Sequence, residues 1–369
     1  MTEDSEIQQV DGNAIYNWME TALRVLIVID GSKDKKEVAS FNRKFLELLA
    51  INDIPHNILP LLPSEMWSIT KEDTVIFRRN LTDDHYLLAP ILTQIWEREI
   101  GVRVFPDWST SWHYDDKISQ YLLCKAHDLP YTESWIFWNK QEALHWAETE
   151  ARYPVVFKLK GGAGSSNVVL VRKRAEAIKL IKAMFGKGIR QWHVPSADNV
   201  WFHPSSFIKT IKWHLLNIMR SFRGEDPMEG YLPHKNYALF QKFLPGNAFD
   251  TRITVIGDRA FAFRRMNRKN DFRSSGSGKI DYDQNKIDKR CLEVAFKVSA
   301  ELKFQSMAYD FLKNESGGIE FCEMSYSYND TAIYNCPGHW DRAGNFIEGH
   351  FWPQTCILEE LLHINIRQP

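Results

Sequence analysis

Two acidic residues stand within apolar segments, Asp310 in MAYDFL and Glu323 in EFCEMS. Because an unpaired carboxylate in such surroundings is costly, each needs a cation or a strong hydrogen-bonding partner. Mg²⁺ is one candidate, since proteins usually hold it with one or two carboxylates together with substrate phosphates. The alternative is that one carboxylate pairs with an arginine, or lies on the exposed face of its strand. The two residues alone leave both interpretations open.

Arginines gather in the segment that precedes these carboxylates. On a hairpin with alternating side chains, Arg252 can share a face with Arg264 or Arg265. The segment continues through Arg268 and Arg273 into a loop rich in glycine and serine, NDFRSSGSGK. Guanidinium groups beside flexible backbone amides suit a transferring phosphoryl group or an acyl phosphate. A solvated charged surface is the alternative, and it is the commoner meaning of a charge run.

The stretch FKLKGGAGSSNVVLV, residues 157–171, has the composition of a phosphate-binding loop. It is not a P-loop, because Lys158 and Lys160 precede the glycines and no Lys-Ser/Thr pair follows them. It is not a dinucleotide fingerprint either, since Asn167 stands in place of the third glycine and NVVLV is typical of a strand. We therefore expect a glycine-rich hairpin that joins two antiparallel strands.

The composition is that of a globular chain with several subdomains. At 369 residues, with 44% apolar and 25% charged residues, the chain exceeds what one core usually serves. A net charge of −1 gives no general attraction for nucleic acid, and no binding to it is expected. Five scattered cysteines indicate neither a zinc site nor a disulfide framework. No signal sequence or apolar run of membrane-spanning length is evident, so we expect a cytoplasmic protein without transmembrane segments.

The patterning predicts where these residues lie. Residues 20–107 alternate strands and helices, which indicates a small α/β unit with parallel pairing. A helix then begins near Asp115 and Asp116. Later segments read as two β-hairpins, one turning at Gly257-Asp258 and one carrying both acidic residues. Residues 186–236 differ in residue composition and patterning from the segments around them and look like an insertion.

The order of these segments resembles the ATP-grasp superfamily, especially its RimK-like carboxylate-amine ligases. The resemblance is carried by Asp-Lys at 116–117, PVVFKLKGGAGSSNV, QKFLPG, DTRITVIGDR, RRMNRKNDFRSSGSG, YDF and EMS. It covers most of the chain from about residue 20. The insertion and the tail YNCPGHWDRAGNFIEGHFWPQ lie outside the common pattern and resemble a branch often met beside polysaccharide-biosynthesis functions.

The resemblance implies an α/β chain with the ATP-grasp fold and an N-terminal Rossmann-like domain. The expected division is residues 1–108 for the N-terminal domain, 109–185 with 237–246 for the small nucleotide-binding subdomain, 186–236 for a helical insertion, and 247–369 for the C-terminal subdomain with the metal site.

The resemblance also implies site residues. ATP would be held by Lys117, Lys158, Lys160, Gly161, Gly162, Gly164, Ser165, Ser166, Gln241, Lys242, Phe243, Leu244 and Asp250. The catalytic arginines would be Arg252, Arg264, Arg268 and Arg273. One or two Mg²⁺ ions would be bound by Asp310, Glu323 and Ser325. Ser325 stands where the family usually has Asn, a better oxygen ligand, so Asn329 or Glu320 are alternative donors.

The implied reaction joins a small-molecule carboxylate to an amine through an acyl phosphate, with sugar-linked substrates among the options. Two alternatives keep the fold: phosphoryl transfer to a hydroxyl, or nucleotide binding without turnover. A homodimer is a further expectation. The stretch 203–222 has an apolar stripe that favours a packed or lid helix over a membrane-surface helix. Trp192, Trp201 and Trp213 could line a sugar pocket.

Overall fold

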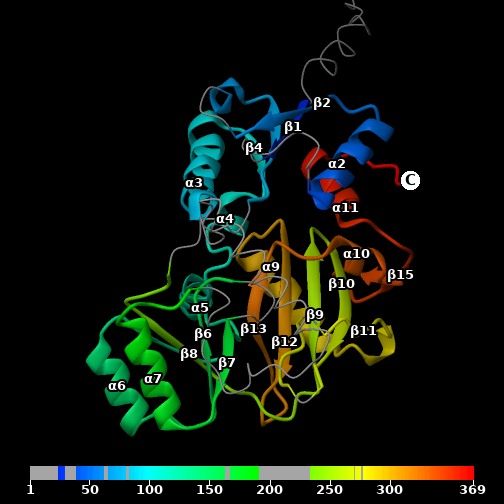
Figure 1. Cartoon of the computed structure of the whole chain (residues 1–369). Coiled ribbons are helices and arrows are strands. Elements are labelled where there is room, and N and C mark those ends of the chain that lie inside the picture. The colour runs from blue at the N-terminus through cyan, green and yellow to red at the C-terminus, as the bar shows by residue number, and fades with distance from the viewer. Residues whose placement is uncertain are drawn as a thin grey trace, which may run out of the picture.

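Three β-sheets organise the part of the chain that the computed structural model describes (Figure 1). That part comprises residues 24–29, 39–61, 65–79, 83–162, 167–190, 233–269, 271–275 and 277–369. Most of the expected 186–236 insertion, with its three tryptophans and its amphipathic stretch, lies outside these residues, as do Gly164, Ser165 and Ser166.

The N-terminal sheet has the order β2-β1-β3-β4 and all of its strands are parallel. Its elements are β1 (Arg24–Ile29), α2 (Ser40–Ile51), β2 (His56–Pro60), η2 (Met66–Ser68), β3 (Asp73–Ile76), α3 (Asp83–Gln94), η3 (Ile95–Ile100) and β4 (Arg103–Phe105). Val25 and Ile27 pack on one side and Leu26 and Val28 on the other, as expected of a parallel sheet covered on both faces. The parallel α/β unit predicted from the sequence is confirmed.

The small sheet is antiparallel, in the order β5-β8-β6-β7. Its strands are β5 (Ser134–Phe137), β6 (Val155–Lys158), β7 (Val168–Val171) and β8 (Ala238–Lys242), and the helices that accompany it are α4 (Trp108–Ser111), α5 (Lys117–Ala126), α6 (Lys140–Thr149) and α7 (Arg174–Met184). Trp146 of α6, Phe157 and Phe240 fill the core between the sheet and the helices α6 and α7. Strands β6 and β7 flank the glycine loop as antiparallel neighbours, which confirms the predicted hairpin.

The large sheet has seven strands, in the order β13-β12-β9-β10-β14-β15 with β11 beside β10. Its elements are β9 (Phe249–Ile256), β10 (Arg259–Met266), β11 (Ile280–Asp281), η5 (Gln284–Lys286), α9 (Lys289–Glu301), β12 (Ser306–Lys313), β13 (Ile319–Ser325), α10 (Asp330–Tyr334), β14 (Gly338–Trp340), β15 (Phe346–Glu348) and α11 (Pro353–Leu362). Helix α9 covers one face through Leu292, Ala295 and Val298. Both predicted hairpins are present.

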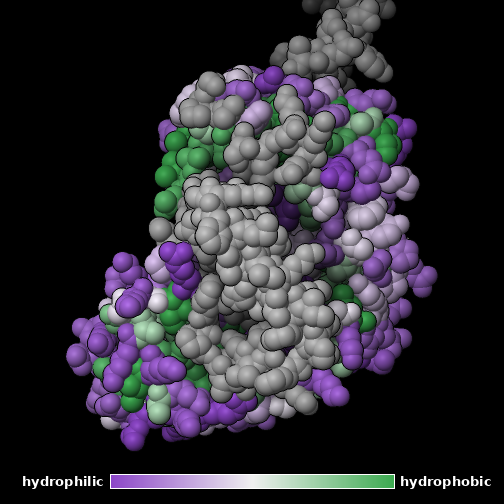
Figure 2. Space-filling view, in the orientation of Figure 1, coloured by the Kyte–Doolittle hydropathy of each residue, from purple (hydrophilic) through white to green (hydrophobic). Residues whose placement is uncertain are grey.

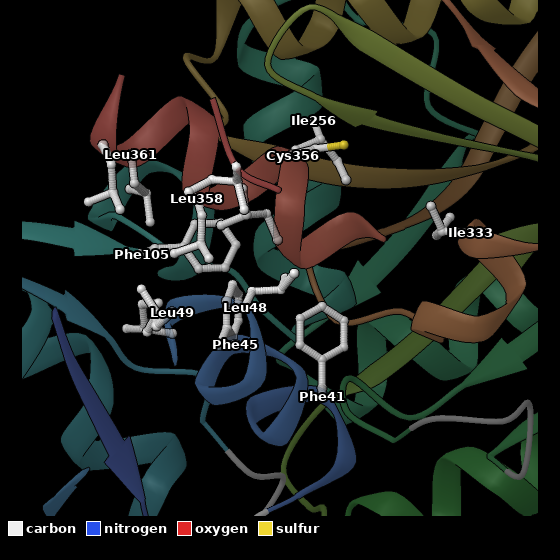
Figure 3. Packing of buried hydrophobic residues seen from close by; sticks show 14 of the residues in the cluster. Phe41, Phe45, Leu48, Leu49, Phe105, Ile256, Ile333, Cys356, Leu358 and Leu361 are labelled. Atoms are coloured by element: carbon white, nitrogen blue, oxygen red, sulfur yellow. The ribbon is translucent and has the colours of Figure 1, made fainter. Parts of the chain in front are cut away.

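The C-terminal tail ties the large sheet to the N-terminal sheet. Its strands β14 and β15 extend the large sheet, and α11 then lies beside α2 (Figure 1). Figure 3 shows Phe45 and Leu48 of α2 beneath Leu358 of α11, and all three side chains are fully buried. The end of the chain is held as well, because Asn52 and Arg367 exchange hydrogen bonds of 3.0 and 2.8 Å.

The visible surface differs between the subdomains. Figure 2 shows apolar residues gathered over α3, where Leu87 and Ile91 are exposed, and mainly hydrophilic residues over α6 and α7. Within the described ranges, no helix combines the length and apolar character needed to cross a membrane.

Candidate functional site

A charged face of the large sheet lies against the small sheet. Asp250 and Arg252 project from β9, Arg265 from β10, Asp310 from β12 and Glu323 from β13. The strand registers place these side chains on one side, because Arg252 pairs with Asp310 and Asp250 pairs with Arg265. Lys158 of β6 reaches across, and its Nζ donates a 3.3 Å hydrogen bond to the carbonyl of Cys322. We call the five large-sheet residues the charged face.

Buried ion pairs hold four of these five residues together. Arg252 donates to both oxygens of Asp310, at 2.7 and 2.8 Å, and Arg265 binds Asp250 in the same two-bond geometry. A further contact of 2.6 Å joins Arg265 to Asp310. Such forked pairs are the strongest side-chain hydrogen bonds that proteins make. They link strands β9, β10 and β12 into one rigid polar unit.

The ionisation of this unit follows from its surroundings. Burial opposes the charged form of Asp310, but the neighbouring Arg252 and Arg265 outweigh it and hold the pKa of Asp310 well below its ordinary value. Burial also disfavours the charge on Arg265, whereas Asp310 and Asp250 raise its pKa. The pKa of Asp250 is raised, chiefly by burial and by the nearby Asp310, although Arg265 opposes this. Asp310 is therefore a firmly ionised partner of two arginines.

Glu323 differs from Asp310 because its carboxylate is accessible. Its side chain is 37% exposed, against 6% for Asp310, and its nearest cation is Lys117, at 3.5 Å. Ser325, the third expected metal ligand, uses its hydroxyl locally: it donates to the carbonyl of Ser327 at 2.9 Å and accepts from the Ser327 amide. Across the described ranges, no group of three or more His, Cys, Asp or Glu residues could hold a metal ion.

The two alternative donors are also engaged elsewhere. Glu320 accepts a hydrogen bond from Asn314, and Asn329 caps helix α10 by accepting from the amide of Ala332. The structure therefore brings Asp310, Glu323 and Ser325 to one face, as their spacing predicts. Asp310 is bound by arginines, whereas the ion-pair partner of Glu323 among the described residues is Lys117.

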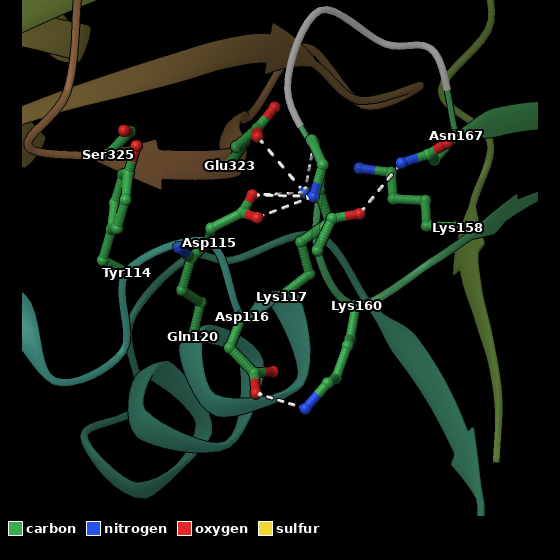
Figure 4. Close-up of polar contacts among 12 residues, drawn as sticks. Tyr114, Asp115, Asp116, Lys117, Gln120, Lys158, Lys160, Asn167, Glu323 and Ser325 are labelled. Atoms are coloured by element: carbon green, nitrogen blue, oxygen red, sulfur yellow. Dashed lines mark hydrogen bonds and ion pairs between the residues drawn. The ribbon is translucent and has the colours of Figure 1, made fainter. Parts of the chain in front are cut away.

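The glycine loop begins with Gly161 and Gly162, which we call its root. This root is held by residues from α5 and the turn before it (Figure 4). Asp115 accepts the Gly162 amide on both oxygens, at 2.9 and 2.7 Å, and Lys117 donates to the Gly162 carbonyl at 3.2 Å. From the other strand, Asn167 donates to the carbonyl of Gly161 at 3.2 Å. Gly162 has φ +108°, and an added Cβ would clash with Asn167, so only glycine fits.

Lys117 lies at the centre of this cluster. Burial disfavours its charge, but Glu323 and Asp115 raise its pKa, so the ammonium is charged. Burial raises the pKa of Asp115, while Lys117 and the Gly162 amide lower it. Figure 4 shows Asp115, Lys117 and Glu323 pointing toward one another. The arrangement leaves a fixed ammonium beside the first glycines of the loop, which suits contact with a phosphate.

The other expected ATP-binding residues divide into two groups. Lys158 is buried and faces the large sheet, whereas Lys160 turns away and lies 3.6 Å from Asp116, the residue that caps α5. In the hinge, Gln241 is buried and donates to Ser134, and Leu244 is buried. Lys242 is exposed, and Phe243 packs edge-on against Phe272.

The structure does not bring Arg264 to the charged face. It lies on the opposite side of β10, where it pairs with Asp281 of β11 and covers the ring of Phe249. Arg265 occupies the charged face instead, which decides between the two candidates. The register of the hairpin could have shown this. A two-residue turn at Gly257-Asp258 pairs Arg265 with Asp250, on the side of Arg252.

The remaining arginines lie in the glycine- and serine-rich loop. Arg268 donates to the carbonyl of Ser275 at 2.9 Å. Arg273 binds Asp271 and donates to the carbonyl of Val168 on β7, at 3.3 Å. Arg273 thus links the large-sheet loop to the strand that follows the glycine loop.

Sequence reasoning missed Asp115 and Asn167 as structural supports of the loop. Asp115 was expected only as an acidic residue near a helix start, and Asn167 only as a departure from a fingerprint. No sequence signal marks Asp115 for this role; in the structure its backbone has a positive φ of 55°, which Asp tolerates better than most residues.

A cavity of about 600 Å³ lies away from these residues, at the outer edge of the N-terminal sheet. It is lined by Arg24, Leu26, Leu46 and residues 56–59, among others. It contains none of the charged face.

Comparison with known proteins finds no matching family model and no matching curated protein. Solved structures do match. A RimK-domain ATP-grasp protein from Sphaerobacter thermophilus aligns at 15% identity and TM-score 0.51, over 92% of this chain and 99% of that one. N5-carboxyaminoimidazole synthase from Aspergillus clavatus aligns at 12% identity and TM-score 0.55, over 93% and 78%. The ATP-grasp ligase PsnB aligns at 15% identity and TM-score 0.51, over 92% and 98%. The agreement confirms the prediction made from motif order: this chain has the ATP-grasp fold.

Proposed function

We propose that this chain binds ATP between the small sheet and the charged face, and uses it to join a carboxylate to an amine with release of ADP and phosphate. The observation that carries the proposal is the convergence of Lys117 and Lys158 on β13 beside the charged face. Two buried ammonium groups, a glycine loop and Arg252 within one region suit a triphosphate. The similar Aspergillus clavatus enzyme was solved in complex with ADP, which supports a nucleotide as the ligand.

The residues fit one Mg²⁺ better than two. Glu323 is the accessible carboxylate, and phosphate oxygens would complete the coordination shell. Asp310 fits less well, because both of its oxygens accept hydrogen bonds from Arg252. When bound, Mg²⁺ would neutralise charge on the phosphate oxygens. The part assigned to Asp310 is to hold Arg252 and Arg265 in position.

The proposed reaction needs no nucleophile from the protein. A carboxylate oxygen of the substrate attacks the γ-phosphorus, so that an O–P bond forms while the bond to the ADP oxygen breaks. The amine nitrogen then bonds to the acyl carbon, phosphate leaves, and the nitrogen gives up a proton. Arg252 and Lys158 would stabilise charge on the phosphoryl group during the first step. Sugar-linked substrates and a homodimer stay predictions.

A second candidate function is nucleotide binding without turnover. Two observations favour it: Asp310 is fully engaged by arginines, and the hydroxyl of Ser325 is engaged within its own turn. On this hypothesis the chain would bind MgATP but release no phosphate with any acid and amine. Phosphoryl transfer to a hydroxyl would share the nucleotide site and differ in its product.

The test is calorimetric titration with MgATP, followed by a phosphate-release screen of carboxylates against amines, including sugar-linked acids and peptides. The ligase proposal expects MgATP binding, and ADP and phosphate release that requires both acid and amine. Formation of ADP and a phosphorylated alcohol, without free phosphate, would indicate a kinase, and absence of MgATP binding would refute the nucleotide site. Arg264→Ala is a suitable control variant, since Arg264 lies on the far side of β10.

A further inference from the structure

Arg78 lies near the candidate site, and among the described residues no carboxylate forms an ion pair with it, although the charge of Asp330 acts on it from a distance. It follows β3 and contacts Ser327, two residues beyond the end of β13. Its Nη2 donates to the hydroxyl of Ser327 at 3.2 Å, and its guanidinium covers the ring of Phe41 at 3.5 Å. Its Nε is buried and has no hydrogen-bond partner among the residues that the structure describes. Burying a charge without an opposite charge is costly, so this guanidinium is incompletely satisfied.

The neighbouring arginines show what Arg78 lacks. Arg252 and Arg265 each bind a carboxylate through two hydrogen bonds. Arg79, the next residue, also has a buried Nε without a partner among the described residues, but it donates to two backbone carbonyls, those of Ser111 and Tyr114. Among the described residues near the site, the acceptor that Arg78 has is one neutral hydroxyl. The side chain is nevertheless only half-buried, so part of it can be reached from solvent.

The position of Arg78 connects it to the charged face. Its partner Ser327 is hydrogen-bonded to Ser325, which lies two residues beyond Glu323 on the same face of β13. On the other side, the Tyr114 ring packs against Tyr326 with centroids 4.4 Å apart, and Tyr114 directly precedes Asp115, which holds the glycine loop. Arg78 of the N-terminal domain is therefore connected to the charged face through Ser327 and Ser325.

We propose that Arg78 and Ser327 form a subsite for an anionic oxygen group, a carboxylate or a phosphate, of the substrate that meets the nucleotide. This inference rests on the proposed function. A guanidinium fork with a hydroxyl beside it binds such groups through two or more charge-assisted hydrogen bonds. The apolar contact with Phe41 holds the guanidinium plane in place before the substrate arrives. The N-terminal domain would thus select acidic substrates.

The test uses the full chain and simple anions as probes. Thermal unfolding is followed while sodium phosphate or sodium acetate replaces sodium chloride at constant ionic strength. Wild-type protein should be stabilised by at least one of the two anions. Stabilisation by phosphate indicates a subsite for a phosphate group, and stabilisation by acetate indicates a subsite for a carboxylate. In Arg78→Leu, the apparent dissociation constant of that anion should rise about tenfold or more, while MgATP affinity changes little.

Three further variants make the test decisive. Arg342→Leu removes an arginine that pairs with Asp258 at the surface, and it should retain the anion response. Arg78→Lys keeps the charge but loses the planar guanidinium group, and it should also weaken anion binding. It replaces Arg78→Leu in the measurement if that variant fails to fold. Lys158→Ala separates this subsite from the nucleotide site. If the response vanishes in Lys158→Ala and persists in Arg78→Leu, the anion binds at the nucleotide phosphates and the inference is wrong.

Failure of the inference and failure of the proposed function have different signatures. If wild-type protein binds MgATP but is not stabilised by phosphate or acetate, the Arg78 subsite alone is refuted. The same holds if both Arg78 variants are stabilised as much as the wild type. Protein that binds no MgATP but still shows Arg78-dependent anion binding refutes the nucleotide proposal and keeps the subsite.

Discussion

Arg252 and Asp310 face each other directly across strands β9 and β12, joined by two hydrogen bonds of 2.7 and 2.8 Å. In the sequence, the arginine suggested a phosphate contact and the aspartate a metal ligand. Paired in this way, each satisfies the other in the absence of ligand. The pair also fixes the guanidinium plane, so that Arg252 needs little rearrangement to face a phosphoryl group.

The first prediction concerns the contribution of this pair to stability. Asp310→Asn removes the charge that compensates Arg252 and Arg265, both largely buried. Breaking a buried ion pair from one side typically costs about 3–5 kcal/mol, so the free energy of unfolding should fall by that amount. Urea titration followed by fluorescence measures it.

Asp281→Asn is the matched control. Asp281 pairs with Arg264 on the opposite side of β10 and is more exposed, so its loss should cost about 1 kcal/mol or less. If Asp310→Asn were as stable as the wild type but lost the Mg²⁺ dependence of nucleotide binding, Asp310 would be a metal ligand rather than a partner of the arginines.

Local patterning was enough to predict the strands that carry the site. Alternation along DTRITVIGDRAFAFRRM predicts a hairpin, because it depends on neighbours within a few residues. The apolar context of Asp310 left its burial open, and the structure buries it. The choice between Arg264 and Arg265 also depended on local information, namely the register that the Gly257-Asp258 turn imposes.

Other parts of the site depend on contacts between distant segments, which periodicity does not encode. Asp115 holds Gly162 through hydrogen bonds that span 47 positions. Ala260 of β10 pairs with Trp340 of β14, and α11 returns to α2 at the beginning of the chain. Arg78 belonged to no motif, since what distinguishes it arises only on folding: among the described residues its side-chain acceptor is the neutral hydroxyl of Ser327.

A second prediction concerns acid sensitivity. His113 is buried against Phe304, and burial, reinforced by Arg79, lowers its pKa from 6.5 to about 4. Between these values the unfolded chain binds a proton that the folded chain does not, so stability should fall as the pH drops from 6.5 toward 4. One such group contributes a slope of up to about 1.4 kcal/mol per pH unit.

The measurement is urea unfolding at several pH values for wild type and His113→Phe, which keeps an aromatic ring against Phe304. His234 and His339 also have a pKa lowered to about 4, so only the difference in slope between the two proteins reports on His113. Equal slopes in wild type and His113→Phe would contradict the prediction.

A third prediction distinguishes the roles of Lys158, the last residue of β6, and Lys160, two residues further on. Lys158 is buried and contacts β13, whereas Lys160 turns toward Asp116 and is partly exposed. Under the proposed function, Lys158→Ala should weaken MgATP binding more than about tenfold, because a charge-assisted contact to phosphate is lost. Lys160→Ala should change it by less than about threefold. Calorimetric titration measures both, and equal losses would place both ammonium groups on the nucleotide.

The last prediction concerns the root of the glycine loop. Gly162→Ala places a methyl group against the Asn167 amide, at a φ of +108° that alanine adopts poorly, so the loop root must shift. If that root positions phosphate, MgATP affinity should fall about tenfold or more. Gly246 also has a positive φ but open space around it, so Gly246→Ala carries similar backbone strain without the clash and should bind MgATP nearly as the wild type does. Adding Asn167→Ala to Gly162→Ala removes the clashing amide. Partial recovery of MgATP affinity in that double variant, relative to Gly162→Ala alone, would show that the steric conflict is the cause, whereas no recovery would assign the loss to backbone strain or to the missing Asn167–Gly161 hydrogen bond.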